Sequence, residues 1–192
     1  MNEKYYNDNA KSFIDNTIDC DMSYLYNFFL KYLPKDSKTI LDLGFGSGRD
    51  SLYFSKSFEV YAIDPVEVFV DNAKNNLGLD NVYCMSAEDV EFKNKFDGIW
   101  ACASLLHIES KNLNLVFKNL SRALKANGVI YCSFKYGEFE GMRNGRFYLD
   151  MNEENITKYL TNTNLEIIDK CLTDDVRTDR NEKWLNLILK KN

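Results

Sequence analysis

Short apolar runs alternate with amphipathic stretches along most of the chain. The apolar runs are rich in β-branched and aromatic residues and predict strands at 39–43, 59–63, 81–85, 96–103 and 129–134. Apolar positions three and four residues apart predict helices at 22–33, at 50–57, from Pro65 to Gly78, and from Leu113 to a stop at 127–128. This alternation favours a mostly parallel sheet with helices on both faces.

The last third of the chain gives a weaker pattern. Residues 155–160 predict a short helix, and 166–173 and 184–190 predict two last strands. The charged connection at 174–180 has balanced signs, which is typical of a solvated turn. The alternative is that this connection places Arg177 near the mouth of a site.

A glycine-rich turn at 44–48 follows the first predicted strand. Glycines there allow positive φ and let backbone N–H groups approach a ligand at the start of a helix. Arg49 stands where a dinucleotide fingerprint needs a small residue, and Asp42 would repel a pyrophosphate but can bind an amino group. Asp64, which closes the second strand, can accept hydrogen bonds from both hydroxyls of a ribose. An amino acid joined to a ribose suggests S-adenosylmethionine.

Five segments carry a family resemblance: DLGFGSG at 42–48, AID at 62–64, SAED at 86–89, FDGIW at 96–100 and LKANG at 124–128. Through them the chain resembles the class I S-adenosylmethionine-dependent methyltransferases, and GSGRDSLY at 46–53 is similar to the tellurite-resistance and thiopurine-type branches. The resemblance implies an α/β fold, a Rossmann-like doubly wound sheet of seven strands whose last strand is antiparallel at the sheet edge. It further implies one domain over 1–192, with an N-terminal helical lid at 1–37, a cofactor-binding core at 38–134, and a substrate lid and last strands at 135–192.

The resemblance also implies residue roles. The expected cofactor-binding residues are Tyr6, Asp42, Gly44, Phe45, Gly46, Arg49, Asp64, Pro65, Ala87, Glu88 and Ala101. The glycine-rich turn would lie under the methionine moiety, with Asp42 and Arg49 at its termini, while Asp64 holds the ribose. Ala87 and Glu88 would contact the adenine. Phe45 stands where the family more often has Cys or Ala, and Ser86 where Asp is frequent.

The expected acceptor residues are His107, Arg143, Arg146 and Tyr148. His107 follows the fourth strand, where the family places the methyl-accepting pocket, and both catalysis and positioning remain open for it. Methyl transfer from a sulfonium needs chiefly alignment, so a base matters only if the acceptor must lose a proton. Segment 135–148 is expected to be a flexible lid.

In that lid, Arg143 and Arg146 would clamp a carboxylate or phosphate, with Tyr136 and Tyr148 as walls. The alternative is that the two arginines are solvated or pair with Glu138 and Glu140.

Composition narrows the function classes. The 192 residues carry 24 Lys and Arg against 29 Asp and Glu, a net charge of −5, which disfavours a broad phosphate-binding face and hence DNA. One histidine and five scattered cysteines argue against a metal site and a disulfide framework. The polar N-terminus and the absence of a long apolar run predict a cytoplasmic protein with no membrane segment.

The sequence therefore predicts an S-adenosylmethionine-dependent methyltransferase that acts on a small-molecule acceptor, anionic if the two lid arginines point inward. RNA or protein as the acceptor, and a non-catalytic S-adenosylmethionine-binding module, remain alternatives because the same fold serves them. The chain is expected to be a monomer or a homodimer.

Overall fold

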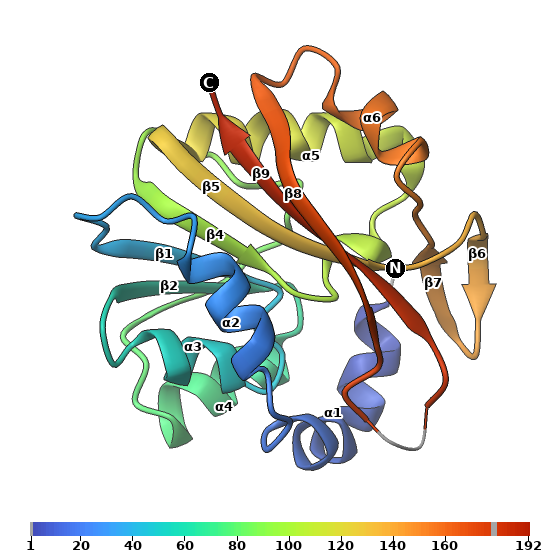
Figure 1. The fold of residues 1–192 in the computed structure, drawn as a ribbon. Helices are drawn as coiled ribbons and strands as arrows, with labels where there is room; N and C mark the ends of the chain where they lie inside the picture. The colour runs from blue at the N-terminus through green and yellow to red at the C-terminus, as the bar shows by residue number, and fades with distance from the viewer. Residues whose placement is uncertain (1, 178–179) are drawn as a thin grey trace.

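A mixed sheet runs through the middle of the computed structural model, which describes residues 2–177 and 180–192 (Figure 1). Within these residues the sheet has seven strands in the order β3-β2-β1-β4-β5-β9-β8. The strands are β1 Thr39–Leu43, β2 Glu59–Asp64, β3 Asn81–Cys84, β4 Phe96–Ala101, β5 Leu124–Lys135, β8 Leu165–Asp174 and β9 Lys183–Lys191. Strands β1 to β5 are parallel, and β9 is antiparallel to both β5 and β8. The predicted seven-stranded α/β fold is confirmed, with the antiparallel strand one position inside the edge.

Helices cover both faces of the sheet. They are α1 Glu3–Thr17, α2 Ser23–Leu30, α3 Arg49–Phe54, α4 Glu67–Asn76, the 3₁₀ turn η1 Leu105–His107, α5 Ser110–Ala123 and α6 Asn155–Leu160. Helices α5 and α6 pack on one face, and α2, α3 and α4 on the other. Figure 1 shows α1 at one end of the sheet, away from α5. The chain therefore has the doubly wound arrangement that its alternating pattern predicts.

The two faces are fixed by apolar stripes. On α5, Leu113, Val116, Phe117 and Leu120 are fully buried at helical spacing, and each contributes about 1.5–3 kcal/mol through burial.

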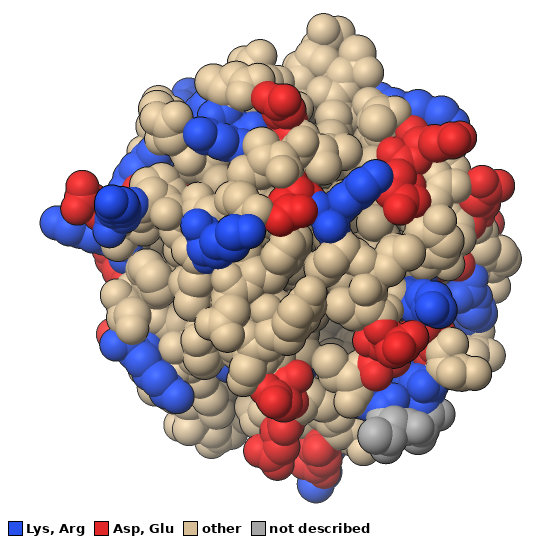
Figure 2. Space-filling view, in the orientation of Figure 1, with Lys and Arg blue, Asp and Glu red and all other residues tan. Residues whose placement is uncertain are grey.

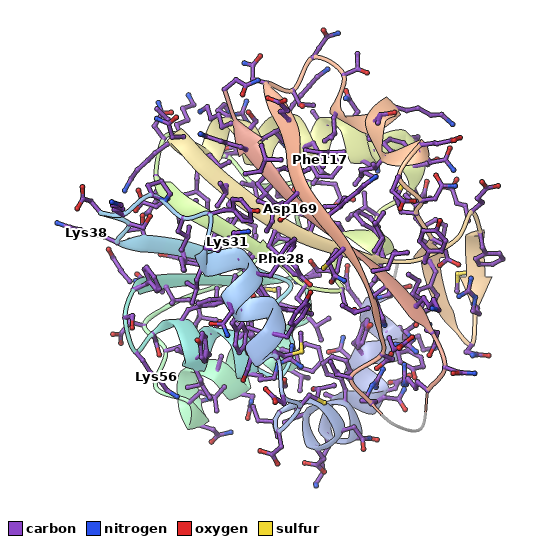
Figure 3. All side chains as sticks on the ribbon, viewed as in Figure 1. Phe28, Lys31, Lys38, Lys56, Phe117 and Asp169 are labelled. Carbon is purple, nitrogen blue, oxygen red and sulfur yellow. The ribbon has the colours of Figure 1, made fainter. Side chains whose placement is uncertain are left out.

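On the other face, the end of α2 meets β8, where Lys31 Nζ lies 4.0 Å from a carboxylate oxygen of Asp169 (Figure 3). No helix among the described residues is long and apolar enough to cross a bilayer.

Segment 135–148, which is expected to be a lid over the acceptor pocket, contains paired strands that the sequence analysis did not predict. It forms a hairpin of β6 Glu140–Arg143 and β7 Arg146–Leu149, apart from the main sheet. Asn144 and Gly145 have φ values of 51° and 77°, and two positive φ values in a two-residue turn match the twist of paired strands. The Asn-Gly pair therefore makes this segment an ordered hairpin.

Two local predictions also change. Helix α5 ends at Ala123, before the expected stop at 127–128, and Leu124 already pairs with Phe96. Asn127, with a φ of 61°, makes an irregularity inside β5 instead. Residues 178 and 179 of the charged connection lie outside the described residues.

Candidate functional site

A cavity of about 670 Å³ opens at the carboxyl ends of the parallel strands. Twelve of the fifteen predicted site residues line it: Tyr6, Gly44, Phe45, Gly46, Arg49, Asp64, Pro65, Ala87, Glu88, His107, Arg146 and Tyr148. Its size falls within the range of small-molecule sites, about 300–1,000 Å³. We call the part at the glycine-rich turn and Asp64 the turn end, and the part at His107, Lys135, Arg146 and Tyr148 the hairpin end.

The glycine-rich turn forms the floor of the turn end. Gly44 has a φ of 73° and donates its N–H to the Ile63 carbonyl at 2.8 Å. A Cβ added to Gly44 would lie 2.5 Å from the Cβ of Ser104. Since side chains do not tolerate that approach, only glycine lets the turn pass beneath the loop after β4. The turn therefore packs directly against Ser104 while Gly44, Phe45 and Gly46 line the cavity.

Asp64 lies at the end of β2, buried beside this turn. Its Oδ1 accepts from the Val66 N–H at 2.9 Å and its Oδ2 from the Gly46 N–H at 3.0 Å. Burial outweighs these two hydrogen bonds and raises the pKa of Asp64 to about 6. A carboxylate has about four acceptor positions, so Asp64 keeps capacity for two further donors, as the hydroxyls of a ribose require.

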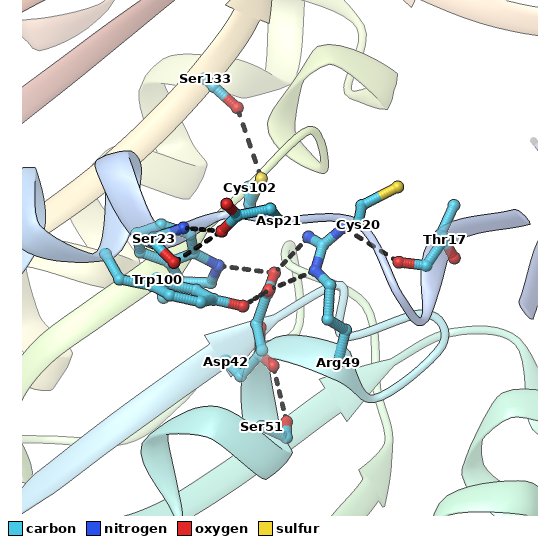
Figure 4. Close-up of polar contacts among 12 residues, drawn as sticks. Thr17, Cys20, Asp21, Ser23, Asp42, Arg49, Ser51, Trp100, Cys102 and Ser133 are labelled. Carbon is cyan, nitrogen blue, oxygen red and sulfur yellow. Dashed lines mark hydrogen bonds and ion pairs between the residues drawn. The ribbon is translucent and has the colours of Figure 1, made fainter. Parts of the chain in front are cut away.

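Arg49 reaches the cavity from a hydrogen-bond network around Asp50 (Figure 4). Its Nε and Nη2 donate to the two carboxylate oxygens of Asp50 at 2.7 and 2.9 Å. Asp50 also accepts from Trp100 Nε1 at 2.8 Å and from the Tyr26 hydroxyl at 2.5 Å. The network fixes the guanidinium at the turn end. Sequence reasoning missed Asp50, Tyr26 and Trp100, and the only local signal was an acid in the first turn of the helix after the glycines.

Asp42 and Ala101 are buried and do not line the cavity. Asp42 Oδ2 accepts a 2.6 Å hydrogen bond from the Ser51 hydroxyl (Figure 4). Burial, reinforced by Asp50, raises the pKa of Asp42 well above its ordinary value. Its contact with the methionine amino group stays a prediction.

At the hairpin end, Tyr6 from α1 meets His107 from η1. The Tyr6 hydroxyl lies 2.9 Å from His107 Nε2, and His107 Nδ1 lies 2.7 Å from the Phe147 carbonyl oxygen. Because a carbonyl oxygen only accepts, Nδ1 carries the hydrogen and Nε2 accepts from Tyr6. Burial lowers the pKa of His107 to about 4. The imidazole is therefore neutral at pH 7.

Arg146 enters the same end from β7. Its guanidinium lies 4.7 Å from the ring centre of Tyr5 and 5.2 Å from that of Tyr148. Its Nη1 donates to the Tyr6 hydroxyl at 3.4 Å, and its buried Nε has no hydrogen-bond partner. In the described part of the chain no carboxylate forms an ion pair with it. Arg146 is thus an uncompensated cation facing the cavity.

Three other basic side chains near the hairpin are paired, whereas Arg180 lines the cavity without an ion pair to another described residue. Arg143 bonds to Asp150 at 2.7 Å and lies outside the cavity lining. Lys135 pairs with Glu182, and Arg177 lies 3.5 Å from Asp175; both cations line the cavity. Among the described residues neither lid arginine pairs with Glu138 or Glu140: Arg143 pairs with Asp150, and the two acids accept from the Asn152 amide and the Ser110 N–H. Tyr136, expected as a wall, is 44% exposed and does not line the cavity.

The residues at the turn end fit S-adenosylmethionine. The backbone of the glycine-rich turn, the spare acceptor capacity of Asp64 and the guanidinium of Arg49 line the cavity and match a methionine backbone, a ribose and a carboxylate. Ala87 and Glu88 line the cavity beyond Asp64, where the adenine is expected. Among residues 2–177 and 180–192, no three His, Cys, Asp or Glu side chains are placed to hold a metal ion.

Comparison with known proteins bears on this fit. Residues 41–132 match the family model of a methyltransferase domain. The phosphoethanolamine N-methyltransferase of Plasmodium falciparum (isolate 3D7) is 27% identical over 157 residues, which cover 74% of this chain and 59% of that protein. The chain therefore spans less than two thirds of that relative's length.

Solved structures share the fold. The 1,6-didemethyltoxoflavin-N1-methyltransferase of Burkholderia thailandensis, solved with 1,6-didemethyltoxoflavin and S-adenosylhomocysteine, superposes with a TM-score of 0.80 at 19% identity over 98% of this chain and 84% of that chain. TehB of Haemophilus influenzae superposes with a TM-score of 0.70 at 16% identity over 99% of this chain and 67% of that chain. Assignment to the tellurite-resistance or thiopurine-type branch stays a prediction. Residues 41–132 thus match a methyltransferase domain, and the chain has the fold of these methyltransferases together with a cavity whose lining fits S-adenosylmethionine.

Proposed function

We propose that this chain is an S-adenosylmethionine-dependent methyltransferase that acts on a small-molecule acceptor carrying a carboxylate or a phosphate. The observation that supports the proposal is Arg146, a cation at the hairpin end with a buried, unpartnered Nε and no carboxylate partner among the described residues. Leaving a buried donor without a partner is costly. An oxyanion bound beside Arg146 would accept from the guanidinium and remove that cost.

The residues of the turn end would hold the cofactor: the backbone at Gly44–Gly46 under the methionine, Asp64 at the ribose, and Ala87 and Glu88 at the adenine. When bound, S-adenosylmethionine would supply a methyl group on a sulfonium: an acceptor atom would attack the methyl carbon in line with the S–CH3 bond, and S-adenosylhomocysteine would leave with the bonding electrons. The chain's own contribution is alignment, because the cavity walls hold the acceptor on one line of approach.

His107 orients the acceptor in this proposal. With a pKa of about 4 it holds a proton poorly at neutral pH. Its Nε2 has a single lone pair, which accepts from the Tyr6 hydroxyl at 2.9 Å, so an acceptor N–H or O–H would bond to Nε2 by displacing that hydroxyl. Tyr148, whose ring centre lies 5.1 Å from that of His107, would wall the same end.

Two observations favour a small acceptor over RNA or protein. A macromolecular acceptor would be favoured by a basic stripe around the cavity mouth, formed by Arg143, Arg146, Lys135, Arg177 and Arg180. Three of these five, Arg143, Lys135 and Arg177, have a carboxylate partner and so present less free positive charge. On the face drawn in Figure 2, Lys and Arg side chains are interspersed with Asp and Glu. By its name, the Plasmodium relative acts on phosphoethanolamine, a small molecule with a phosphate, which agrees with the proposed class.

The test is methyl transfer from labelled S-adenosylmethionine to a panel of small amines, alcohols and thiols, each offered as an acid and as its neutral ester. We expect turnover of acidic members and a KM raised about 10-fold or more by Arg146→Gln, since a charge-assisted hydrogen bond is worth about 1.5–3 kcal/mol. Arg143→Gln, on the same hairpin but outside the cavity lining, is the matched control and should leave KM unchanged. Equal turnover of acids and esters, or labelling of RNA or protein alone, would overturn the proposal.

A further inference from the structure

Asn2 makes an unusual pair of contacts for a residue at the start of a helix. Its side chain is 8% exposed. Its Nδ2 donates to the Phe147 carbonyl at 3.1 Å, and its Oδ1 accepts from the Phe147 N–H at 2.8 Å. The amide thus bonds both polar groups of one residue on β7, as a neighbouring strand would. The residue before α1 is in this way fixed to the hairpin.

The Phe147 carbonyl that Asn2 holds is the same one that bonds His107. It accepts from Asn2 Nδ2 at 3.1 Å and from His107 Nδ1 at 2.7 Å. A carbonyl oxygen has two lone pairs, so these two donors use its capacity. Asn2 and His107 therefore share this carbonyl, which β7 and the Asn2 amide hold beside the imidazole.

Asn2 also helps to place the other partner of His107. The backbone carbonyl of Asn2 accepts from the Tyr6 N–H at 3.1 Å, the first hydrogen bond of α1. The Tyr6 hydroxyl then reaches His107 Nε2. The Asn2 side chain thus contacts Phe147, which bonds His107 Nδ1, and the Asn2 backbone contacts Tyr6, which bonds His107 Nε2.

Among the groups around the ring, only the Phe147 carbonyl can select the tautomer. The Tyr6 hydroxyl can donate or accept, so it is compatible with either tautomer. The remaining titratable groups are Tyr148, Arg146 and Lys135; the two cations only donate, and neither is recorded as bonding the ring. An acceptor-only carbonyl at Nδ1 is therefore what keeps the hydrogen on that nitrogen.

We propose that Asn2 is a positioning residue for His107: by holding the Phe147 carbonyl, it keeps the imidazole in the Nδ1–H tautomer with the Nε2 lone pair toward Tyr6 and the hairpin end of the cavity. The meaning of this arrangement for methyl transfer rests on the proposed function. The arrangement itself does not, and it can be measured without an acceptor.

The test uses the fact that His107 is the only histidine in the chain. In ¹⁵N-labelled protein, long-range ¹H–¹⁵N spectra of the imidazole report the tautomer directly, and no assignment is needed. For the wild type near pH 7 we expect one pyrrole-type nitrogen and one pyridine-type nitrogen. In Asn2→Ala we expect the two shifts to move toward each other, because both tautomers become populated.

Asn7→Ala is the matched control, since Asn7 is exposed on the same helix, and it should give the wild-type spectrum. Asn2→Asp keeps an acceptor for the Phe147 N–H, so the hairpin stays attached to the start of α1. It has no donor for the Phe147 carbonyl, so only the contact proposed to position His107 is removed. We expect this variant to bind S-adenosylhomocysteine like the wild type and yet show shifts displaced toward those of Asn2→Ala.

Unchanged imidazole shifts in both Asn2 variants would overturn the proposal, as would a wild type in the Nε2–H tautomer. If Asn2→Ala fails to fold, the Asn2→Asp spectrum decides. If the wild type does not bind S-adenosylhomocysteine, the proposed cofactor site is wrong, whatever the imidazole shifts show. Failure of the proposed function can therefore be distinguished from failure of the proposed role of Asn2.

Discussion

Arg49 Nη1 donates to the backbone carbonyl of Thr17 at 3.3 Å, which joins the helix after the glycine-rich turn to the last residue of α1. The opposite end of α1 is held by Asn2 on Phe147. Several α1 residues line the cavity, Tyr6 and Phe13 among them. The wall that α1 provides is therefore fixed at both ends, once to the turn end and once to the hairpin end.

Removing the charge at Arg49 should destabilise the fold. The side chains of Arg49 and Asp50 are 17% and 9% exposed. In Arg49→Gln the buried Asp50 carboxylate keeps Trp100 and Tyr26 as donors but loses its ion pair, the only one it forms among the described residues. Breaking a buried pair from one side costs about 3–5 kcal/mol. Urea unfolding should show this loss, whereas Arg122→Gln, at an exposed position on α5, should change stability by less than about 0.5 kcal/mol. Equal midpoints for Arg49→Gln and the wild type would argue against the network.

Gly44→Ala should weaken cofactor binding as well as stability. The new Cβ would lie 2.5 Å from Ser104 Cβ at a φ of 73°, so both steric overlap and backbone strain oppose it. Gly78→Ala separates the two effects, because Gly78 has a φ of 64° and nothing within 4 Å of an added Cβ. We expect Gly78→Ala to cost about 1–2 kcal/mol from strain alone. It should leave S-adenosylhomocysteine affinity unchanged, and Gly44→Ala should lower that affinity in calorimetric titrations.

The fold was predictable because its signals are local. The strand at 39–43 and the helix at 155–160 have the predicted bounds, since apolar spacing and the glycine-rich turn are read within a few residues. The hairpin turn at Asn144-Gly145 was equally local, and its signal was overlooked. An Asn-Gly pair between residues of strand propensity is the strongest short-range indication of a hairpin.

The finer contacts of the site were not predictable in the same way. Asn2 and Phe147 are 145 residues apart, and Tyr6 and His107 are 101 residues apart. Nothing local distinguishes Asn2 from other asparagines of an asparagine-rich chain. Likewise, Arg143 and Arg146 differ only in where the hairpin directs them, one toward Asp150 and one into the cavity. Such partners follow from tertiary structure alone.

Asp64 should control cofactor affinity. Asp64→Ala removes the carboxylate expected at the ribose, and we expect calorimetric titration with S-adenosylhomocysteine to show micromolar binding in the wild type and none in the variant. Because the pKa of Asp64 is about 6, wild-type affinity should be constant above pH 7 and fall by up to about 10-fold between pH 6 and pH 5, as the carboxylate is protonated. Affinity that is flat from pH 7.5 to pH 5 would contradict this role.

His107 should make the fold sensitive to acid. Its pKa is lowered to about 4 from an ordinary 6.5, so between these values the unfolded chain binds a proton that the folded chain does not. Stability is therefore lost as the pH falls from 6.5 toward 4, and above 6.5 this contribution is constant. The full effect is about 3 kcal/mol at 1.36 kcal/mol per pKa unit.

The raised pKa of Asp64 acts in the opposite sense over nearly the same range, since its folded form holds a proton that the unfolded chain has lost. The measurement must therefore be a difference between two proteins. We expect the stability of the wild type relative to His107→Gln, from urea unfolding at each pH, to decline steadily from pH 6.5 to pH 4.5, because the Asp64 contribution cancels. A difference that stays constant over that interval would show that His107 has the same pKa in the folded and unfolded chains. The description of His107 as a buried, neutral imidazole bonded to Tyr6 and Phe147 would then be wrong.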